Sequence, residues 1–421
     1  MTRRLLTFLV LIVFLWPSKA SGAEAGGVDV VVLNGPMDGR LLQFAMDAIE
    51  GSDASVVVLQ VDVSAVLDAE AVDLLALVSE PPLPIAVWVG PAPGVAHGLA
   101  ALLPAVVEIG GAAPGVEIGW ASPLVAGGGD DADRIGGIAP DYPSEAIAGT
   151  IEVTEPVPGL IDTVQPSIGQ FIVALDGRAV SFAGGTATLS TAVHEVVDGV
   201  DTVSPSVNVR FIEPGLTDRL LRLGVRPETA FFFLLLGLTL AVFEFYSAGP
   251  GLGAVAAVMC LAIAGYGLAV LPIWWPGFAG VLAGLGLYVV EFQRNDLGWK
   301  TLLGALLIGA GGLRFVDAAP QMVPSWWIVL IVVLGTTMSF AFAMTTVVRS
   351  RFSTQTIGRE HLVGRTGTAL GEIAPEGFVV VDGAEWRARS TRASGIRAGD
   401  AVVVAAVEGI TLAVDKVGDR V

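Results

Sequence analysis

Residues 229–248 read TAFFFLLLGLTLAVFEFYSA, a run of twenty residues in which Glu244 carries the only charge. A helix of about 20 apolar residues matches the hydrocarbon thickness of a bilayer. Four further apolar runs follow, and breaks containing glycine, proline or charged residues separate them. These runs cover residues 251–271, 274–292, 301–316 and 326–347. The sequence therefore predicts a membrane bundle of about five helices over residues 229–347.

The charge of the chain is concentrated in the segment that precedes this bundle. The 421 residues carry a net charge of −18, and residues 24–228 hold 28 acidic side chains against seven arginines, a net of −21. Such a surface repels phosphate, which argues against nucleic acid or an anionic bilayer surface as a partner of this segment. The single cysteine excludes a disulfide framework and a zinc-cysteine site.

The N-terminus has the features of a secretory signal. Arg3 and Arg4 precede an apolar run over residues 5–16, and the small residues Ser21-Gly22-Ala23 follow. This pattern predicts a cleavable signal over residues 1–23, with an uncleaved anchor as the alternative. Residues 24–228 are then extracytoplasmic. Five crossings place residues 348–421 in the cytoplasm, in agreement with the positive-inside tendency.

A short repeat occurs within the membrane segment. The stretch GLTLAVFEF at residues 237–245 recurs 47 residues later as GLGLYVVEF at residues 284–292, so that Glu244 and Glu291 occupy equivalent positions. Carboxyl groups within membrane helices are costly, which makes each a candidate for a structural or functional role. Both lie close to a helix end, which favours capping of neighbouring backbone over an ion or proton role.

Residues 28–128 alternate β-branched runs with amphipathic stretches, a pattern typical of a mostly parallel α/β domain. The expected strands cover residues 28–34, 54–63, 85–90 and 106–109, and the expected helices cover residues 39–49 and 69–78. Residues 125–145 are expected to form a surface loop, since they contain the run GGGDDAD.

Three motifs in this segment resemble the ClpP-like, crotonase-type domain of the NfeD family of membrane proteins. They are ASVVVLQVD at residues 54–62, PIAVWVGP at residues 84–91 and APGVEIGWASP at residues 113–123. The stretch GQFIVALDGR at residues 169–178 is similar to that domain's closing strand and turn. In long-form members the resemblance implies a serine protease with a Ser-Lys dyad and an oxyanion hole formed by paired glycines.

The sequence departs from that catalytic pattern at each position. Residues 62–66, DVSAV, lack the glycines, and residues 94–101, GVAHGLAA, lack a serine, threonine or cysteine. Lysine is absent between Lys19 and Lys300, and arginine cannot replace a neutral amine. A rebuilt triad around His97 or His194 lacks a Gly-x-Ser-x-Gly motif. We therefore predict no catalytic residues, and the absence of clustered ligands predicts no metal or cofactor.

The last segment contains short β runs at regular spacing, which predicts a small closed barrel of the OB type. The runs cover residues 361–370, 377–381, 385–390, 400–406 and 411–417. The stretches GREHLVGRTG (358–367), VDGAEWRA (381–388) and VEGITLAV (407–414) resemble the NfeD C-terminal domain. The segment has a net charge of +1 and few aromatic residues, which favours protein contact over nucleic acid.

Taken together, these patterns predict a multi-domain membrane protein with a signal (1–23), a degenerate ClpP-like α/β domain (24–228), a helical membrane bundle (229–347) and an OB-fold barrel (348–421). We expect a non-catalytic membrane scaffold in the lipid bilayer, with homo-oligomerisation open. The family resemblance implies a stomatin- or flotillin-like membrane partner. The alternatives are a membrane-bound serine protease of the ClpP class with unrecognised catalytic residues and a small-solute transporter that uses Glu244 and Glu291.

Overall fold

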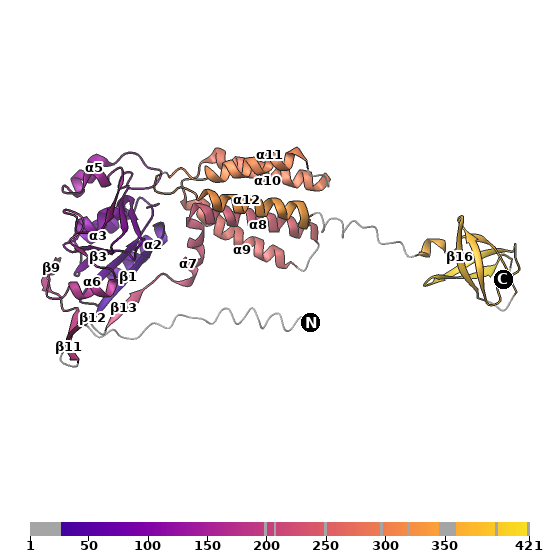
Figure 1. The fold of residues 1–421 in the computed structure, drawn as a ribbon, viewed down its shortest axis with the longest axis horizontal. Coiled ribbons are helices and arrows are strands. Elements are labelled where there is room, and N and C mark those ends of the chain that lie inside the picture. The colour runs from indigo at the N-terminus through magenta and orange to yellow at the C-terminus, as the bar shows by residue number, and fades with distance from the viewer. Residues whose placement is uncertain are drawn as a thin grey trace. The chain divides into compact units, whose positions relative to one another are not determined.

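A computed structural model gives the fold and describes residues 27–197, 200–205, 208–247, 251–294, 298–318, 320–344, 359–391 and 395–418. The chain divides into two compact units, Met1–Met344 and Thr345–Val421. The first unit contains both the α/β layers and the helical bundle (Figure 1). The expected signal at residues 1–23 lies outside the described residues.

A parallel sheet of six strands forms the centre of the α/β part. Its order is β13-β1-β2-β3-β5-β8, and every neighbouring pair is parallel. The strands are β1 (Val28–Asn34), β2 (Val56–Asp62), β3 (Ile85–Val89), β5 (Gly110–Ala112), β8 (Thr163–Val164) and β13 (Val209–Ile212). A second sheet contains β4 (Val95–His97), β6 (Val116–Gly119) and β7 (Thr150–Val153). The predicted α/β class is confirmed.

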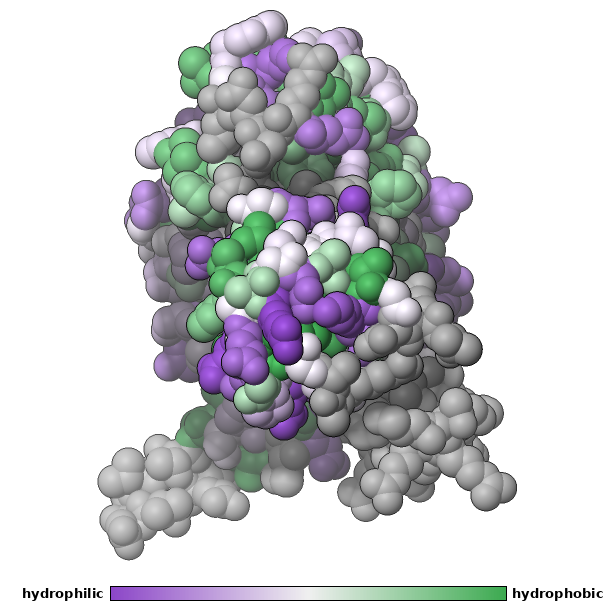
Figure 2. Space-filling model, turned by 90° about the vertical axis from the view of Figure 1, so that its right-hand side faces the viewer, coloured by the Kyte–Doolittle hydropathy of each residue, from purple (hydrophilic) through white to green (hydrophobic). Residues whose placement is uncertain are grey.

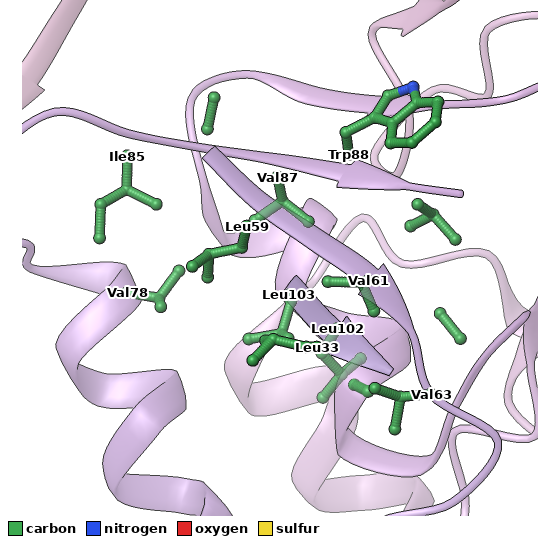
Figure 3. Packing of buried hydrophobic residues seen from close by; sticks show 14 of the residues in the cluster. Leu33, Leu59, Val61, Val63, Val78, Ile85, Val87, Trp88, Leu102 and Leu103 are labelled. Carbon is green, nitrogen blue, oxygen red and sulfur yellow. The ribbon is translucent and has the colours of Figure 1, made fainter. Parts of the chain in front are cut away.

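Helices cover the central strands β1, β2 and β3, which are largely buried and mostly aliphatic, whereas the edge strand β13 is partly exposed. The helices are α2 (Gly39–Glu50), α3 (Ala71–Ser79), α4 (Leu103–Val106), α5 (Ala132–Ile138) and α6 (Ile168–Ala174). Figure 3 shows how Leu59 and Val87 from neighbouring strands pack with Leu103 of α4. Smaller elements complete this part: η1 (Gly98–Leu102), η2 (Ser144–Ala146), and the hairpins β9 (Ala179–Phe182) with β10 (Gly185–Thr188) and β11 (Ala192–Val197) with β12 (Val200–Pro205).

Three sequence-based assignments in this part are wrong. Residues 106–109 are not a strand; β5 begins at Gly110, where small residues are needed because the Phe171 ring lies 2.2 Å from the position of a Cβ on Gly111. Residues 169–178 are not a strand and turn but belong largely to α6, which Ser167 caps by accepting the amide of Gln170. The expected loop at residues 125–145 contains α5.

In the part of the chain that the structure describes, five apolar helices form the bundle, and Figure 1 shows these helices lying side by side. They are α8 (Pro227–Ser247), α9 (Leu252–Val270), α10 (Trp275–Arg294), α11 (Trp299–Leu313) and α12 (Trp326–Met338), the last followed by a π-helical turn at Ser339–Met344. Within the described residues, α8, α9 and α10 are long and apolar enough to cross a membrane, and α11 and α12 are shorter apolar helices. The short helix α7 (Leu216–Arg222) and the turn η3 (Leu223–Val225) lead into α8.

The second unit is the predicted five-stranded closed barrel, with the order β14-β15-β16-β18-β17. The turn η5 (Arg359–Leu362) precedes β14 (Thr366–Ala369), β15 (Glu376–Val381), β16 (Ala384–Ser390), β17 (Ala401–Glu408) and β18 (Thr411–Lys416). Asp382 and Gly383 both adopt positive φ in the β15–β16 turn, as an Asp-Gly hairpin requires. Figure 2 shows hydrophilic and hydrophobic residues interspersed on the surface that faces the viewer.

Candidate functional site

Residues 94–101, the turn in which the sequence analysis looked for a nucleophile, are formed by β4 and η1. Three successive amides of this turn donate to backbone carbonyls: His97 to Val63 at 2.9 Å, Gly98 to Trp120 at 3.0 Å and Leu99 to Leu124 at 2.9 Å. An oxyanion hole requires donors aimed at the reacting oxygen. These three amides are already paired within the fold, so they are not available for that role.

Gln321, from the segment between α11 and α12, packs against the same turn. Its Nε2 donates to the carbonyls of Trp120 at 2.8 Å and Pro123 at 2.6 Å, and the side chain is buried. A Cβ on Gly98, whose φ is +62°, would lie 3.4 Å from this Nε2. A residue of the membrane region thus occupies the space beside the turn. The sequence signal for it was slight, a polar residue after Pro320 in a break between apolar runs.

His97 is buried in this turn, and its side chain makes one polar contact in the described part of the chain. Its Nδ1 lies 3.1 Å from the carbonyl oxygen of Ser64, and its Nε2 has no partner. Burial lowers the pKa of His97, because the imidazolium would lose its hydration. The imidazole is therefore neutral at pH 7. The backbone of His194 lies in β11, and its side chain is outside the described part of the structure.

We expect the burial of His97 to make folding stability depend on pH. In the unfolded chain the imidazole titrates near 6.5, and in the folded chain it titrates lower. The contribution of His97 to the free energy of unfolding is constant above pH 6.5. Below pH 6.5 the free energy of unfolding falls by up to about 1.4 kcal/mol per pH unit until the folded pKa is reached, because the unfolded state takes up the proton first. His97→Gln should remove this slope and His361→Gln should keep it, as measured by thermal unfolding of the full chain between pH 7.5 and 5.5. An identical slope in His97→Gln would contradict the assignment.

The two membrane carboxylates cap the hairpins of the bundle. Glu244 accepts the amide of Gly251 at 2.9 Å, and Glu291 accepts the amide of Gly298 at 2.6 Å. Each glycine immediately precedes the next helix, α9 or α11, so each carboxylate satisfies an amide at a helix start. The Glu291 side chain also accepts the hydroxyl of Thr301 at 2.5 Å. The sequence repeat is thus a repeat of capped helical hairpins.

A hydrogen bond joins the two hairpins at the next equivalent pair. The Gln293 amide nitrogen donates to the Tyr246 hydroxyl at 2.7 Å, and these residues are also 47 positions apart. The Tyr246 ring packs edge-on against Phe292, with ring centroids 4.9 Å apart. Across the described ranges, no group of three or more His, Cys, Asp or Glu side chains is arranged to bind a metal ion.

Removing the Glu291 cap is expected to destabilise the bundle. Glu291→Ala leaves the Gly298 amide and the Thr301 hydroxyl without their acceptor, which costs about 1–3 kcal/mol for partly buried groups. Glu244→Ala is the matched comparison, since the structure gives its carboxylate one amide donor, and its effect should be smaller. Thermal unfolding of both variants in detergent measures the difference. Equal or reversed effects would count against the capping role.

Comparison with known proteins gives two domain matches. Residues 228–345 match the NfeD integral membrane domain, and residues 359–416 match the NfeD-like C-terminal, partner-binding domain. The membrane-bound protease PH1510 of Pyrococcus horikoshii is 28% identical over 220 residues, which cover 50% of this chain and 49% of that protein. The chain thus spans about half the length of this relative.

Solved structures resemble separate parts of the chain. The C-terminal domain of stomatin operon partner protein 1510-C from Pyrococcus horikoshii is 38% identical, covering 14% of this chain and 94% of that one, with a TM-score of 0.14. The 1510-N membrane protease specific for a stomatin homolog, from the same organism, is 18% identical, covering 47% and 98%, with a TM-score of 0.35. Residues 228–345 and 359–416 thus belong to the two NfeD domain families that they match, an integral membrane domain and a C-terminal, partner-binding domain.

Proposed function

We propose that this chain is a non-catalytic membrane scaffold whose barrel binds a stomatin- or flotillin-like membrane protein. The observation that carries the proposal is the turn at residues 94–101. It has no hydroxyl or thiol nucleophile, and its amides at His97, Gly98 and Leu99 donate to backbone carbonyls. Covalent catalysis needs an activated nucleophile, and transition-state stabilisation needs unengaged donors.

The barrel supplies the partner surface in this proposal. Its residues match a domain described as partner-binding, and the 1510-C relative is described as a stomatin operon partner. Leu370 and Phe378 lie opposite each other across β14 and β15, where the Leu370 amide donates to the Phe378 carbonyl at 2.9 Å. Both side chains are about half exposed. Exposed paired apolar side chains are typical of protein contact sites.

In this proposal, each segment lies on the side of the membrane that the sequence analysis predicts. Residues 1–23 act as a signal, residues 24–228 lie outside the cytoplasm, residues 229–347 cross the bilayer, and residues 348–421 reach the partner from inside. The net charge of −21 on residues 24–228 and the net charge of +1 on residues 348–421 argue against nucleic acid as a partner. Association between copies of the chain is compatible with this arrangement.

A second candidate is a membrane-bound serine protease that uses other residues, and the name of the PH1510 relative favours it. A fluorophosphonate probe, which labels activated serines, separates the two functions. The full chain in detergent should remain unlabelled at a probe concentration that fully labels a serine protease control. Labelling of one serine per chain would overturn the scaffold proposal.

A further inference from the structure

A cavity of about 440 Å³ lies between the end of β1 and the segment that leads into α8. Its walls include three arginines close together in the sequence, Arg219, Arg222 and Arg226. Residues 24–228 contain seven arginines and 28 acidic residues, so nearly half of the positive charge of this segment gathers here. The cavity is therefore a local exception to the acidic character of the segment.

Two of these arginines are neutralised by the protein itself. The Nε of Arg222 donates to the Asp38 carboxylate at 2.9 Å, and its Nη2 donates to the carbonyls of Asn34 and Pro36. Arg219 pairs with Glu213, the one carboxylate in the lining of the cavity. These contacts hold the positions of Arg219 and Arg222, and they engage the carboxylates of Glu213 and Asp38.

Arg226 has no such partner. No hydrogen bond or ion pair to its guanidinium occurs within the part of the chain that the structure describes. The guanidinium lies above Gly35, with Nη2 and Nε 3.8 and 3.9 Å from the position that a Cβ would take there. Gly35 has a φ of +78° and no side chain to fill this space. A positive charge without a counter-charge thus stands at the wall of an open cavity, an arrangement suited to an anion.

The contacts of η3 place the cavity near one end of the bundle. The backbone at Gly224 packs directly on α9, because a Cβ on Gly224 would lie 2.2 Å from the carbonyl oxygen of Ile263. This contact is seven residues from the end of α9 at Val270, or about 10 Å along a helix. Trp275 and Trp326, at the starts of α10 and α12, are exposed as in the aromatic belt of a membrane interface.

The outer face of α7 also fits a membrane interface. The spacing of one helix face is followed by Leu216 and Leu220 of α7 and continued by Leu223, the first residue of η3, and each is between 45% and 73% exposed. Figure 1 shows α7 between the α/β layers and the bundle. An apolar stripe beside the first apolar helix is suited to the boundary between lipid headgroups and acyl chains.

We propose that this cavity binds the phosphate of an anionic glycerophospholipid, with Arg226 as its principal charged contact and the leucine stripe of α7 against the acyl chains. The repulsion expected from a net charge of −21 applies to the segment as a whole, whereas the cavity wall is positive. The lipid, rather than free phosphate, is the ligand because the cavity adjoins a stripe of exposed leucines. This inference is independent of whether the chain is a scaffold or a protease.

Native mass spectrometry of the full chain in detergent tests the proposal. Phosphatidylglycerol and phosphatidylcholine are titrated against the native chain, Arg226→Gln and Arg178→Gln. The native chain should retain one phosphatidylglycerol about tenfold more tightly than phosphatidylcholine, as expected for one charge-assisted contact. Arg226→Gln should lose this preference. Arg178→Gln, which removes the same charge from an exposed site in the same segment, should keep it.

Two further measurements test whether charge accounts for the preference and whether the bound anion is a lipid or inorganic phosphate. Arg226→Lys should restore part of the preference, which shows that charge and not misfolding accounts for the loss. Inorganic phosphate at ten times the lipid concentration should displace little of the bound phosphatidylglycerol. Equal retention by Arg226→Gln and the native chain, or full displacement by inorganic phosphate, would overturn the proposal.

Discussion

Replacing Leu370 and Phe378 together with alanine is expected to weaken binding of a stomatin-like partner by about 100-fold. Each side chain is about half exposed in the free barrel, and the two are neighbours across adjacent strands. Truncating a residue at the centre of a protein interface costs about 1–2 kcal/mol or more, so loss of two gives a change of about two orders of magnitude. Pull-down from detergent extract, with the full chain as bait, measures the loss.

The matched control for this pair is Ile410→Ala. Ile410 is an exposed apolar residue on the same barrel, in the turn between β17 and β18. The opposite end of β17 pairs with β14, so Ile410 lies away from Leu370. Its replacement should leave capture unchanged. Undiminished capture by the double variant would place the partner surface elsewhere, and equal loss in all variants would point to general damage.

Asp38→Ala is expected to cost about 3–5 kcal/mol, the effect of removing one partner from a buried ion pair. Asp38 is fully buried and caps α2 by accepting the amide of Leu41. Its carboxylate also accepts from Arg222 and from the hydroxyl of Tyr266 in α9. The substitution therefore leaves the Arg222 guanidinium, only 11% exposed, without its counter-charge. It also removes a direct link between the α/β layers and the bundle.

Hydrogen exchange of β1 amides in the full chain measures this cost. Tyr266→Phe removes one hydroxyl from the same cluster and should cost about 1 kcal/mol. Asp133→Ala removes an exposed carboxylate and should change little. An effect of Asp38→Ala no larger than that of Asp133→Ala would show that the cluster does not stabilise this boundary.

Local patterns predicted most of the fold, because periodicity and turn chemistry act over a few residues. The runs at residues 28–34 and 39–49 became β1 and α2, and the Asp382-Gly383 pair became a tight turn. The prediction failed where packing overrides local preference. The β-branched residues of the 169–178 stretch lie in a helix because Ser167 caps it and Phe171 and Ile172 face the core.

The candidate sites were less accessible to sequence reasoning than the fold. The lack of a hydroxyl or thiol in residues 94–101 and of lysine between Lys19 and Lys300 could be recognised directly, and the equivalent positions of Glu244 and Glu291 indicated a shared role. The contact of Gln321 with Trp120, by contrast, joins residues 201 positions apart, and the placement of Arg226 over Gly35 depends on how α7 meets β1. No local pattern encodes such contacts, because they depend on the packing of distant elements.

The central claim, that this chain holds a partner without cleaving it, is tested most directly by the intact mass of the captured protein. The purified full chain is incubated with a stomatin-like membrane protein, and the bound fraction is analysed by mass spectrometry over several hours. We predict that the partner is recovered in complex at its full mass. Fragments that accumulate with time, and that a serine protease inhibitor prevents, would contradict the claim.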